Sequence, residues 1–149
     1  MKKLRFNIEI NAPASKVFQA IIDDKMYREW TSEFSPSSFF RGSWNKGDKI
    51  YFVGTGEDGK EGGMIATVVE NIPNKQISLR HLGILDGKDE ITSGPKVEGW
   101  VNAMEEYFFN EQNGITSFDV AVDTKSEFKD YFENTWPKAL NKLKEIAER

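Results

Sequence analysis

The longest helical pattern of the chain lies at its C-terminal end, from Ser126 to Arg149. Apolar residues recur there at steps of three and four, which places them on one face of a helix. Pro137 lies inside this pattern and predicts a kink, or a division into a short and a longer helix, near Glu133 to Trp136. A face this apolar must be buried against another element. Its members are Phe128, Phe132, Trp136, Ala139, Leu140, Leu143, Ile146 and Ala147.

Alternation of apolar and polar residues predicts strands over most of the remaining chain. Two short helices interrupt the strands, one from about Ala14 to Ile22 after Pro13, and a second one that carries Tyr27 and Trp30. The glycine-rich and charged segment Gly83 to Lys96 is expected to be a long exposed loop. The expected strands are Leu4 to Ile10, Phe39 to Phe40, Lys49 to Val53, Met64 to Ile72, Gln76 to Leu82, Val97 to Phe109 and Thr116 to Val122.

The order of these elements predicts an α+β fold. Short turns join the strands, which favours a curved antiparallel sheet of six or seven strands. The C-terminal helix has the longest apolar face in the sequence, so the sheet is expected to wrap around this helix. The chain has 149 residues and no internal repeat or linker, and we therefore expect one domain that covers residues 1–149.

Composition and charge exclude several classes of protein. With 20 basic and 24 acidic residues the formal net charge is −4, and no basic cluster marks a nucleic-acid surface. The chain contains no cysteine, which excludes disulfides and thiolate metal sites. No signal-peptide pattern follows the basic start, and no window approaches the about 18 apolar residues of a membrane-spanning helix. We expect a soluble cytoplasmic protein with no nucleic-acid partner and no membrane span.

Three charged or titratable side chains are candidates for chemistry. His81 is the only histidine, and its strand parity with Ile77 points it inward, as a hydrogen-bonded core residue, a polar ligand anchor or an acid/base. Glu105 and Glu106 are neighbours on a strand, so the side chain of one faces inward and that of the other faces outward. A carboxylate in a dry cavity could act as a general acid. In the simpler interpretation the acidic member faces water.

Two further motifs have a structural explanation. The glycines of Gly54 to Gly59 match the spacing of a dinucleotide-binding loop, but a strand follows where a helix is required, so the motif is interpreted as a turn. Asp86, Asp89 and Glu90 share one segment without the spacing of a calcium loop. Since one histidine cannot form a multi-histidine site, we expect no metal and no cofactor.

The order of elements, together with four short motifs, resembles the SRPBCC superfamily, the START-like or birch-pollen-allergen-like helix-grip fold. Within it the chain is most similar to the activator of heat-shock-protein-90 ATPase homologue family, and the resemblance covers nearly the whole chain. The motifs are Asn11 to Phe18 followed by Trp30, Gly42 to Trp44 followed by Gly47 to Ile50, Gly114 to Thr116, and Trp136 followed by Leu140 and Leu143.

This resemblance implies an elongated cavity between the sheet and the C-terminal helix. The leading hypothesis is a non-enzymatic binding domain, a monomer or homodimer, that holds a small apolar or lipid-like ligand there. The family has no shared catalytic set, so no catalytic residue is assigned. The side chains expected around the ligand are Trp30, Trp44, Tyr51, His81, Trp100, Tyr107, Phe128, Tyr131, Phe132 and Trp136.

Two alternatives stay open. A module that interacts with a chaperone, as the family name and its link to the stress response imply, predicts an exposed apolar patch. Phe108 and Phe109 are consecutive, so one of them could contribute to such a patch. An enzyme similar to the cyclase and hydratase members of the superfamily would need His81 beside an inward carboxylate or tyrosine.

Overall fold

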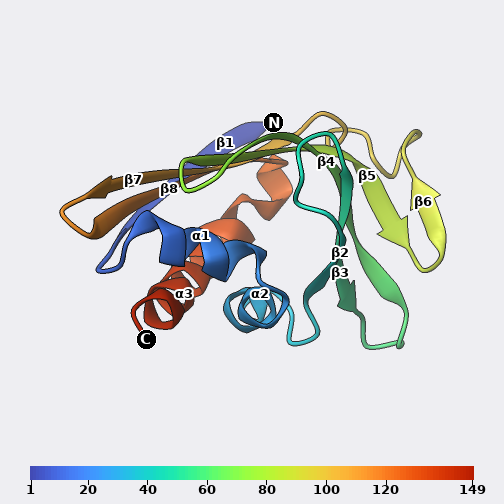
Figure 1. Cartoon of the computed structure of the whole chain (residues 1–149). Coiled ribbons are helices and arrows are strands. Elements are labelled where there is room, and N and C mark those ends of the chain that lie inside the picture. Colours follow the sequence, from blue (N-terminus) through green and yellow to red (C-terminus); the bar gives the residue numbers. More distant parts are fainter.

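The computed structural model describes residues 1–149, and it forms one antiparallel sheet with three α-helices on one face (Figure 1). This is the expected α+β helix-grip arrangement. The helices are α1 (Ala14–Ile22), α2 (Asp24–Thr31) and α3 (Lys129–Ala147), with a 3-10 turn, η1 (Ser126–Phe128), before α3. The strands are β1 (Lys2–Ile10), β2 (Phe39–Gly42), β3 (Lys49–Thr55), β4 (Glu61–Ile72), β5 (Gln76–Asp86), β6 (Asp89–Ile91), β7 (Met104–Gln112) and β8 (Ile115–Thr124).

The sheet brings the two ends of the chain together. Its strand order is β1-β8-β7-β5-β4-β3-β2, and the short β6 pairs only with β5. The first strand therefore lies beside the last, with Leu4 opposite Val122. α3 follows β8 after the short turn η1. The pairing of β8 with β1 therefore brings α3 against β1 and along α1 and α2. No helix is both long enough and apolar enough to cross a membrane.

The segment Gly83 to Lys96 is not the predicted long loop. β5 continues to Asp86 and turns back as β6, in a tight hairpin in which Gly87 has a φ of 64°. A positive φ at the first turn position suits the twist of a two-residue hairpin, and glycine adopts it without strain. Backbones also approach closely here, because a Cβ on Gly83 would lie 2.1 Å from the Ile91 carbonyl oxygen.

The predicted strand Val97 to Phe109 begins too early. Residues 97–103 form turns, and β7 starts at Met104. Local backbone hydrogen bonds take the place of pairing with a neighbouring strand there. One of them joins the N–H of Trp100 to the Val97 carbonyl at 2.8 Å. The prediction was wrong because Val97 and Ala103, both buried, anchor a folded loop instead of alternating along a strand. Phe109 is buried and Phe108 lies half-buried on the other face of the sheet.

α3 is one continuous helix, so of the two predicted effects of Pro137, a kink or a division, the division does not occur. Pro137 has no N–H to donate to the carbonyl of Glu133. Both residues lie on the exposed side of the helix, where water can bind the freed carbonyl. α1 and α2 meet at Asp23, whose N–H bonds to the Gln19 carbonyl while its carboxylate caps Met26 N–H at 3.0 Å.

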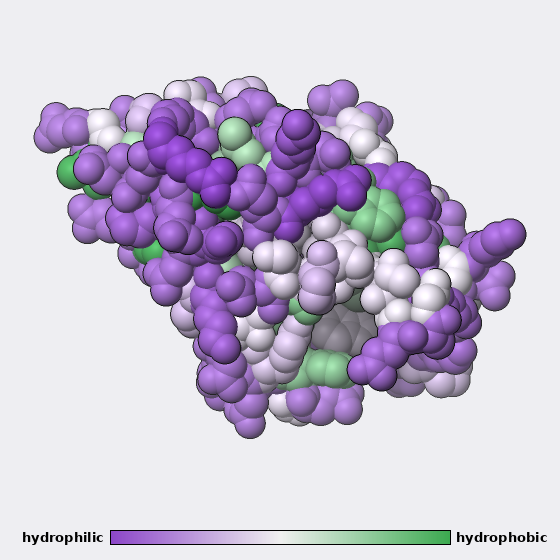
Figure 2. Space-filling model, turned by 90° about the horizontal axis from the view of Figure 1, so that it is seen from below, coloured by the Kyte–Doolittle hydropathy of each residue, from purple (hydrophilic) through white to green (hydrophobic).

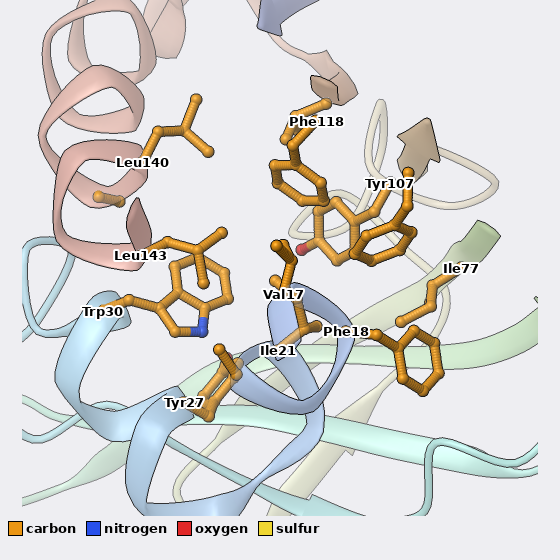
Figure 3. Packing of buried hydrophobic residues seen from close by; sticks show 14 of the residues in the cluster. Val17, Phe18, Ile21, Tyr27, Trp30, Ile77, Tyr107, Phe118, Leu140 and Leu143 are labelled. Atoms are coloured by element: carbon orange, nitrogen blue, oxygen red, sulfur yellow. The ribbon is translucent and has the colours of Figure 1, made fainter. Parts of the chain in front are cut away.

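The core fills the space between the sheet and the helices. Figure 3 shows side chains from all three helices converging on side chains of the sheet. Members of this core cluster come from α1, α2 and α3 and from strands β1, β3, β4, β5, β7 and β8. Among its buried members are Val17, Phe18, Ile21, Tyr27, Trp30, Ile77, Tyr107, Phe118, Leu140 and Leu143.

Candidate functional site

A cavity of about 420 Å³ lies between the sheet, α2 and the first half of α3. Its 21 lining residues come from every layer of the fold, and 13 of them are hydrophobic. The volume falls within the range of small-molecule sites, about 300–1,000 Å³. Figure 2 views the helical side of the molecule and shows a hollow in the surface. The cavity is therefore a concave, mostly apolar site of the size that a small organic ligand needs.

Eight of the ten predicted side chains line this cavity. α3 contributes three of them, and the loop before β7 places Trp100 against Phe128, with 5.6 Å between their ring centroids. That these side chains bind a ligand stays a prediction. The eight are Trp30, His81, Trp100, Tyr107, Phe128, Tyr131, Phe132 and Trp136.

The other two predicted residues lie outside the cavity. Trp44 is buried in the core, where its ring lies 5.7 Å from Phe52. Tyr51 is on the opposite face of the sheet and donates its hydroxyl to Glu90 at 2.8 Å. Strand parity explains the error at Tyr51, since successive side chains of a strand point to opposite faces. In β3 it is Phe52, not Tyr51, that reaches the cavity.

Aromatic rings form a continuous wall along one side. The ring of Tyr27 lies 5.5 Å from Trp30, and Trp30 lies 6.1 Å from Trp136. Trp136 continues the series to Tyr107 at 6.3 Å. Tyr27 and Trp30 are three residues apart, so they share one face of α2. Flat rings in contact through edges and tilted faces give a wall that is rigid and apolar.

One end of the cavity is polar. The hydroxyl of Tyr107 donates to Glu105 Oε2, two residues earlier on the same face of β7. Glu105 Oε1 lies 3.6 Å from His81 Nε2 on β5, which is beyond hydrogen-bond distance. Glu105 therefore faces the cavity, and for this residue the interpretation that the acidic side chain faces water is wrong. Glu106 instead accepts a hydrogen bond from Ser78 at 2.8 Å, outside the cavity.

Backbone irregularities hold this polar end in place. The pairing of β4 with β5 shifts register between Ile65 and Ala66, so His81 sits beside a bulge. Bulges of this kind redirect side chains. The N–H of His81 bonds to the Ala103 carbonyl at 2.8 Å, so the folded loop continues the sheet here. Gly63 in the cavity wall has to be glycine, because a Cβ would lie 1.8 Å from the Phe52 carbonyl oxygen.

Both tyrosine hydroxyls at this end stay protonated. Burial, and then the negative charge of Glu105, raises the pKa of Tyr107 well above its ordinary value. Burial and the same carboxylate also raise the pKa of Tyr27, against a smaller opposing effect of the Ser38 hydroxyl. The two phenols are therefore neutral hydrogen-bond donors over the physiological pH range.

Two nitrogen atoms in the cavity wall have no hydrogen-bond partner. They are Nε1 of Trp30 and Nδ1 of His81, on side chains whose residues are only 2% and 6% exposed. A buried polar group without a partner destabilises a protein by about 1–3 kcal/mol. Both atoms are shielded from solvent, so they belong to the packed part of the wall and are not available to a ligand in the cavity.

Several cavity residues were not predicted from the sequence. Glu105 could have been found from its parity with Tyr107, and Tyr27 from its helical spacing to Trp30. Phe34, Ser35 and Ser38 come from an irregular segment with no periodic pattern. The unpredicted lining residues are Tyr27, Thr31, Phe34, Ser35, Ser38, Phe52, Val53, Gly54, Gly63, Met64, Glu105, Val122 and Asp123.

The two remaining motifs lie apart from the polar end of the cavity. The Gly54 to Gly59 segment forms the end of β3 and the turn into β4, as predicted. Asp86 pairs with Lys60 at 2.7 Å, and Glu90 pairs with Lys49 at 3.1 Å. These carboxylates are exposed or half-exposed and are occupied by lysines on the outer surface of the hairpin.

The geometry allows binding and also contains groups that could move protons. Apolar walls exclude water, while Glu105, Tyr107 and His81 form an acceptor and donor set at one end. This is the arrangement that the enzyme hypothesis requires, a histidine beside an inward carboxylate and a tyrosine. Geometry of this kind is shared by binding pockets and acid/base sites, and it assigns no reaction.

Comparison with known proteins supports this architecture. The chain resembles the solution structure of the Aha1 dimer from Colwellia psychrerythraea, with 20% identity, a TM-score of 0.72, and coverage of 99% of this chain and 97% of that one. It also resembles a protein from Nitrosomonas europaea, with 14% identity, a TM-score of 0.72, and coverage of 97% and 92%. At these identities the likeness shows the fold alone. No curated protein is significantly similar to the chain in sequence.

CalU16 from Micromonospora echinospora shares the fold as well, with 14% identity and a TM-score of 0.67 over 97% of this chain and 75% of that one. The family model described as "Activator of Hsp90 ATPase homolog 1-like protein" matches residues 11–148, from the end of β1 through α3. Because this match includes nearly every element that surrounds the cavity, the chain belongs to the family of activator of Hsp90 ATPase homolog 1-like proteins.

Proposed function

We propose that this chain is a non-enzymatic binding domain that holds a small, largely apolar ligand between the sheet and α3. The observation that carries the proposal is the cavity of about 420 Å³ with its aromatic wall and its polar end. Burial of apolar ligand surface contributes roughly 25 cal/mol per Å² to such binding. The polar end then fixes the orientation of the ligand, as in most small-molecule sites.

Native mass spectrometry of the purified chain, compared with its denatured mass, tests this function directly. We expect a discrete additional mass that disappears on denaturation, or that appears after incubation with apolar compounds. Val122→Phe places a ring at a cavity-lining position of β8 and should abolish the additional mass. Circular dichroism of the variant verifies that it remains folded. An unliganded mass under all conditions, in a protein that is folded, would contradict the proposal.

A second candidate function is interaction with a chaperone, and one observation favours it. Phe128 and Tyr131 are 41% and 46% exposed at the cavity, so aromatic surface reaches solvent beside α3. The family description names an ATPase activator of Hsp90, and that activity belongs to the proteins after which the family is named. The double variant Phe128→Ser/Tyr131→Ser should weaken chaperone binding if this role is correct. Stimulation of chaperone ATPase that is equal in both proteins would exclude this surface.

A further inference from the structure

We infer that the ligand is an apolar amine that binds as a cation, with its ammonium group at Glu105 and its apolar body against the aromatic wall. This inference rests on the proposed function and specifies the chemistry of the ligand. It depends on the charges of the cavity wall, on the unused hydrogen-bonding capacity of Glu105, and on the faces of the surrounding rings.

Carboxylates outnumber basic side chains in the cavity wall. Its lining residues include the carboxylates Glu105 and Asp123 and one histidine, but no lysine or arginine. Two lysines lie nearby: Lys3 pairs with Asp123, and Lys125 lies over the Trp100 ring, 5.7 Å from its centroid. A carboxylate ligand such as a fatty acid would find no lysine or arginine within the wall and would be repelled by Glu105.

The two carboxylates of the wall are not equivalent. Asp123 is already satisfied, because Lys3 Nζ lies 3.0 Å from Oδ1 and the N–H of Met104 donates to Oδ2 at 2.9 Å. Glu105 accepts one hydrogen bond, from Tyr107 through Oε2, and its Oε1 has none. An unpaired carboxylate oxygen in an apolar cavity is a strong acceptor for a charged N–H donor.

His81 is the side chain nearest to the open oxygen of Glu105. His81 is nearly fully buried and directs Nε2 toward Glu105, while its Nδ1 has no partner. The indole Nε1 of Trp30, in the aromatic wall, is likewise unpaired. Both unpaired nitrogens are shielded from solvent, so the polar position that the wall leaves open to a ligand is Oε1 of Glu105.

The aromatic wall stabilises a cation as well as an apolar body. The rings of Tyr27, Trp30, Trp136 and Tyr107 follow one another at centroid distances of 5.5 to 6.3 Å. Tyr107 carries this series directly to Glu105. The negative faces of Trp and Tyr attract ammonium groups, most strongly where water is excluded. The charge of Glu105 also reaches the hydroxyls of Tyr27 and Tyr107, since it contributes to their raised pKa values.

Three compounds on one scaffold separate charge from apolar burial: para-butylbenzylamine, para-butylbenzyl alcohol and para-butylbenzoic acid. Their dissociation constants are measured by isothermal titration calorimetry at neutral pH with the full chain. We expect the amine to bind about tenfold or more tightly than the alcohol, because charged hydrogen bonds are the stronger ones. The benzoic acid should bind most weakly.

Glu105→Gln should remove the preference for the amine over the alcohol. Glu106→Gln is the matched control, since it removes the same charge from the neighbouring position on the other face of β7. Equal affinities of amine and alcohol for the unaltered chain, or an amine preference that survives Glu105→Gln, would overturn the inference and leave the proposed function standing. Failure of all three compounds to bind would overturn both.

Discussion

The two halves of α3 lie on the same sheet and differ in what they do there. Residues after Pro137 face a filled core, and the buried ones are no more than 3% exposed: Ala139, Leu140, Leu143, Ile146 and Ala147. Residues before Pro137 face the cavity instead, namely Tyr131, Phe132 and Trp136. One helix therefore supplies both a packed anchor and the wall of a site.

Side-chain shape explains the difference between the two halves. Branched and small side chains interdigitate at the density of an organic crystal, as expected of Val17, Ile21, Leu140 and Leu143 within one buried cluster. Large flat rings are rigid and meet through edges and tilted faces. In the first half of α3 such rings surround the cavity instead of filling it.

Polar contacts reinforce the packed half. Glu148 Oε2 accepts from the N–H of Asn11 at 2.7 Å and from Lys144, and Lys144 Nζ also donates to the Glu9 carbonyl at 3.1 Å. These bonds tie the C-terminal end of α3 to the bend between β1 and α1. At the cavity end, Tyr131 makes one long bond to the Phe34 carbonyl at 3.2 Å. The packed end therefore has more polar ties to the rest of the fold than the cavity end.

Leu143→Ala should give the largest loss of stability without affecting the site. Leu143 is 0% exposed, so its truncation leaves a cavity in a core that cannot collapse. We expect a decrease of about 3 kcal/mol in the free energy of unfolding, measured by urea denaturation. The affinity for para-butylbenzylamine should stay unchanged under conditions in which the variant is folded. A parallel loss of affinity would show that the two halves are not independent.

Much of the fold could be predicted from the sequence, because the long helix and most strands follow a simple period. Leu4 to Ile10 and Thr116 to Val122 alternate without interruption, and the structure pairs them as β1 and β8. The predictions failed where backbone geometry overrides the pattern. Residues 97–103 fold into turns in which Asn102 adopts a φ of 72°, and apolar residues of a folded loop resemble those of a strand.

The site was less predictable than the fold. Aromatic residues on α3 could be assigned to the cavity, since the helix period fixes their direction. Assignment of Tyr51 failed because a difference of one residue moves a strand side chain to the other face. The parity of Glu105 with Tyr107 gives its inward direction wherever β7 begins, although the strand was predicted to begin seven residues too early, at Val97 instead of Met104.

Phe132→Ala should mainly weaken ligand binding, whereas Leu143→Ala should mainly lower the stability of the fold. Phe132 is half-buried in the cavity wall, so its removal costs about 1 kcal/mol of stability but takes away an apolar contact for the ligand. We expect the dissociation constant for para-butylbenzyl alcohol to rise about tenfold, as for loss of a buried aromatic contact. Calorimetry and urea denaturation of the same preparation measure both quantities. A large loss of stability with unchanged affinity would assign Phe132 to the core.

The smallest predicted effect concerns the polar contacts at the packed end. The hydrogen bond from Lys144, and then the N–H of Asn11, lowers the pKa of the Glu148 carboxyl below its ordinary value of 4.5. A lowered pKa in the folded state means that the ionised carboxylate stabilises the fold above the ordinary pKa, and that this contribution is lost as the pH falls through the lowered value. Glu148→Gln should therefore decrease Tm slightly at neutral pH, and the difference from the unaltered chain should diminish as the pH falls below the ordinary pKa of the carboxyl.

Thermal denaturation followed by circular dichroism between about pH 7 and about pH 3 measures this difference. Glu145→Gln is the matched control, because Glu145 lies on the same turn of α3 and contacts Lys142 at 3.9 Å instead of the bend at Asn11. Its pH profile should follow that of the unaltered chain more closely. If both variants lost stability equally, the contribution would come from the net charge of the helix end, and the specific contact between Glu148 and Asn11 would not be what secures the packed half of α3.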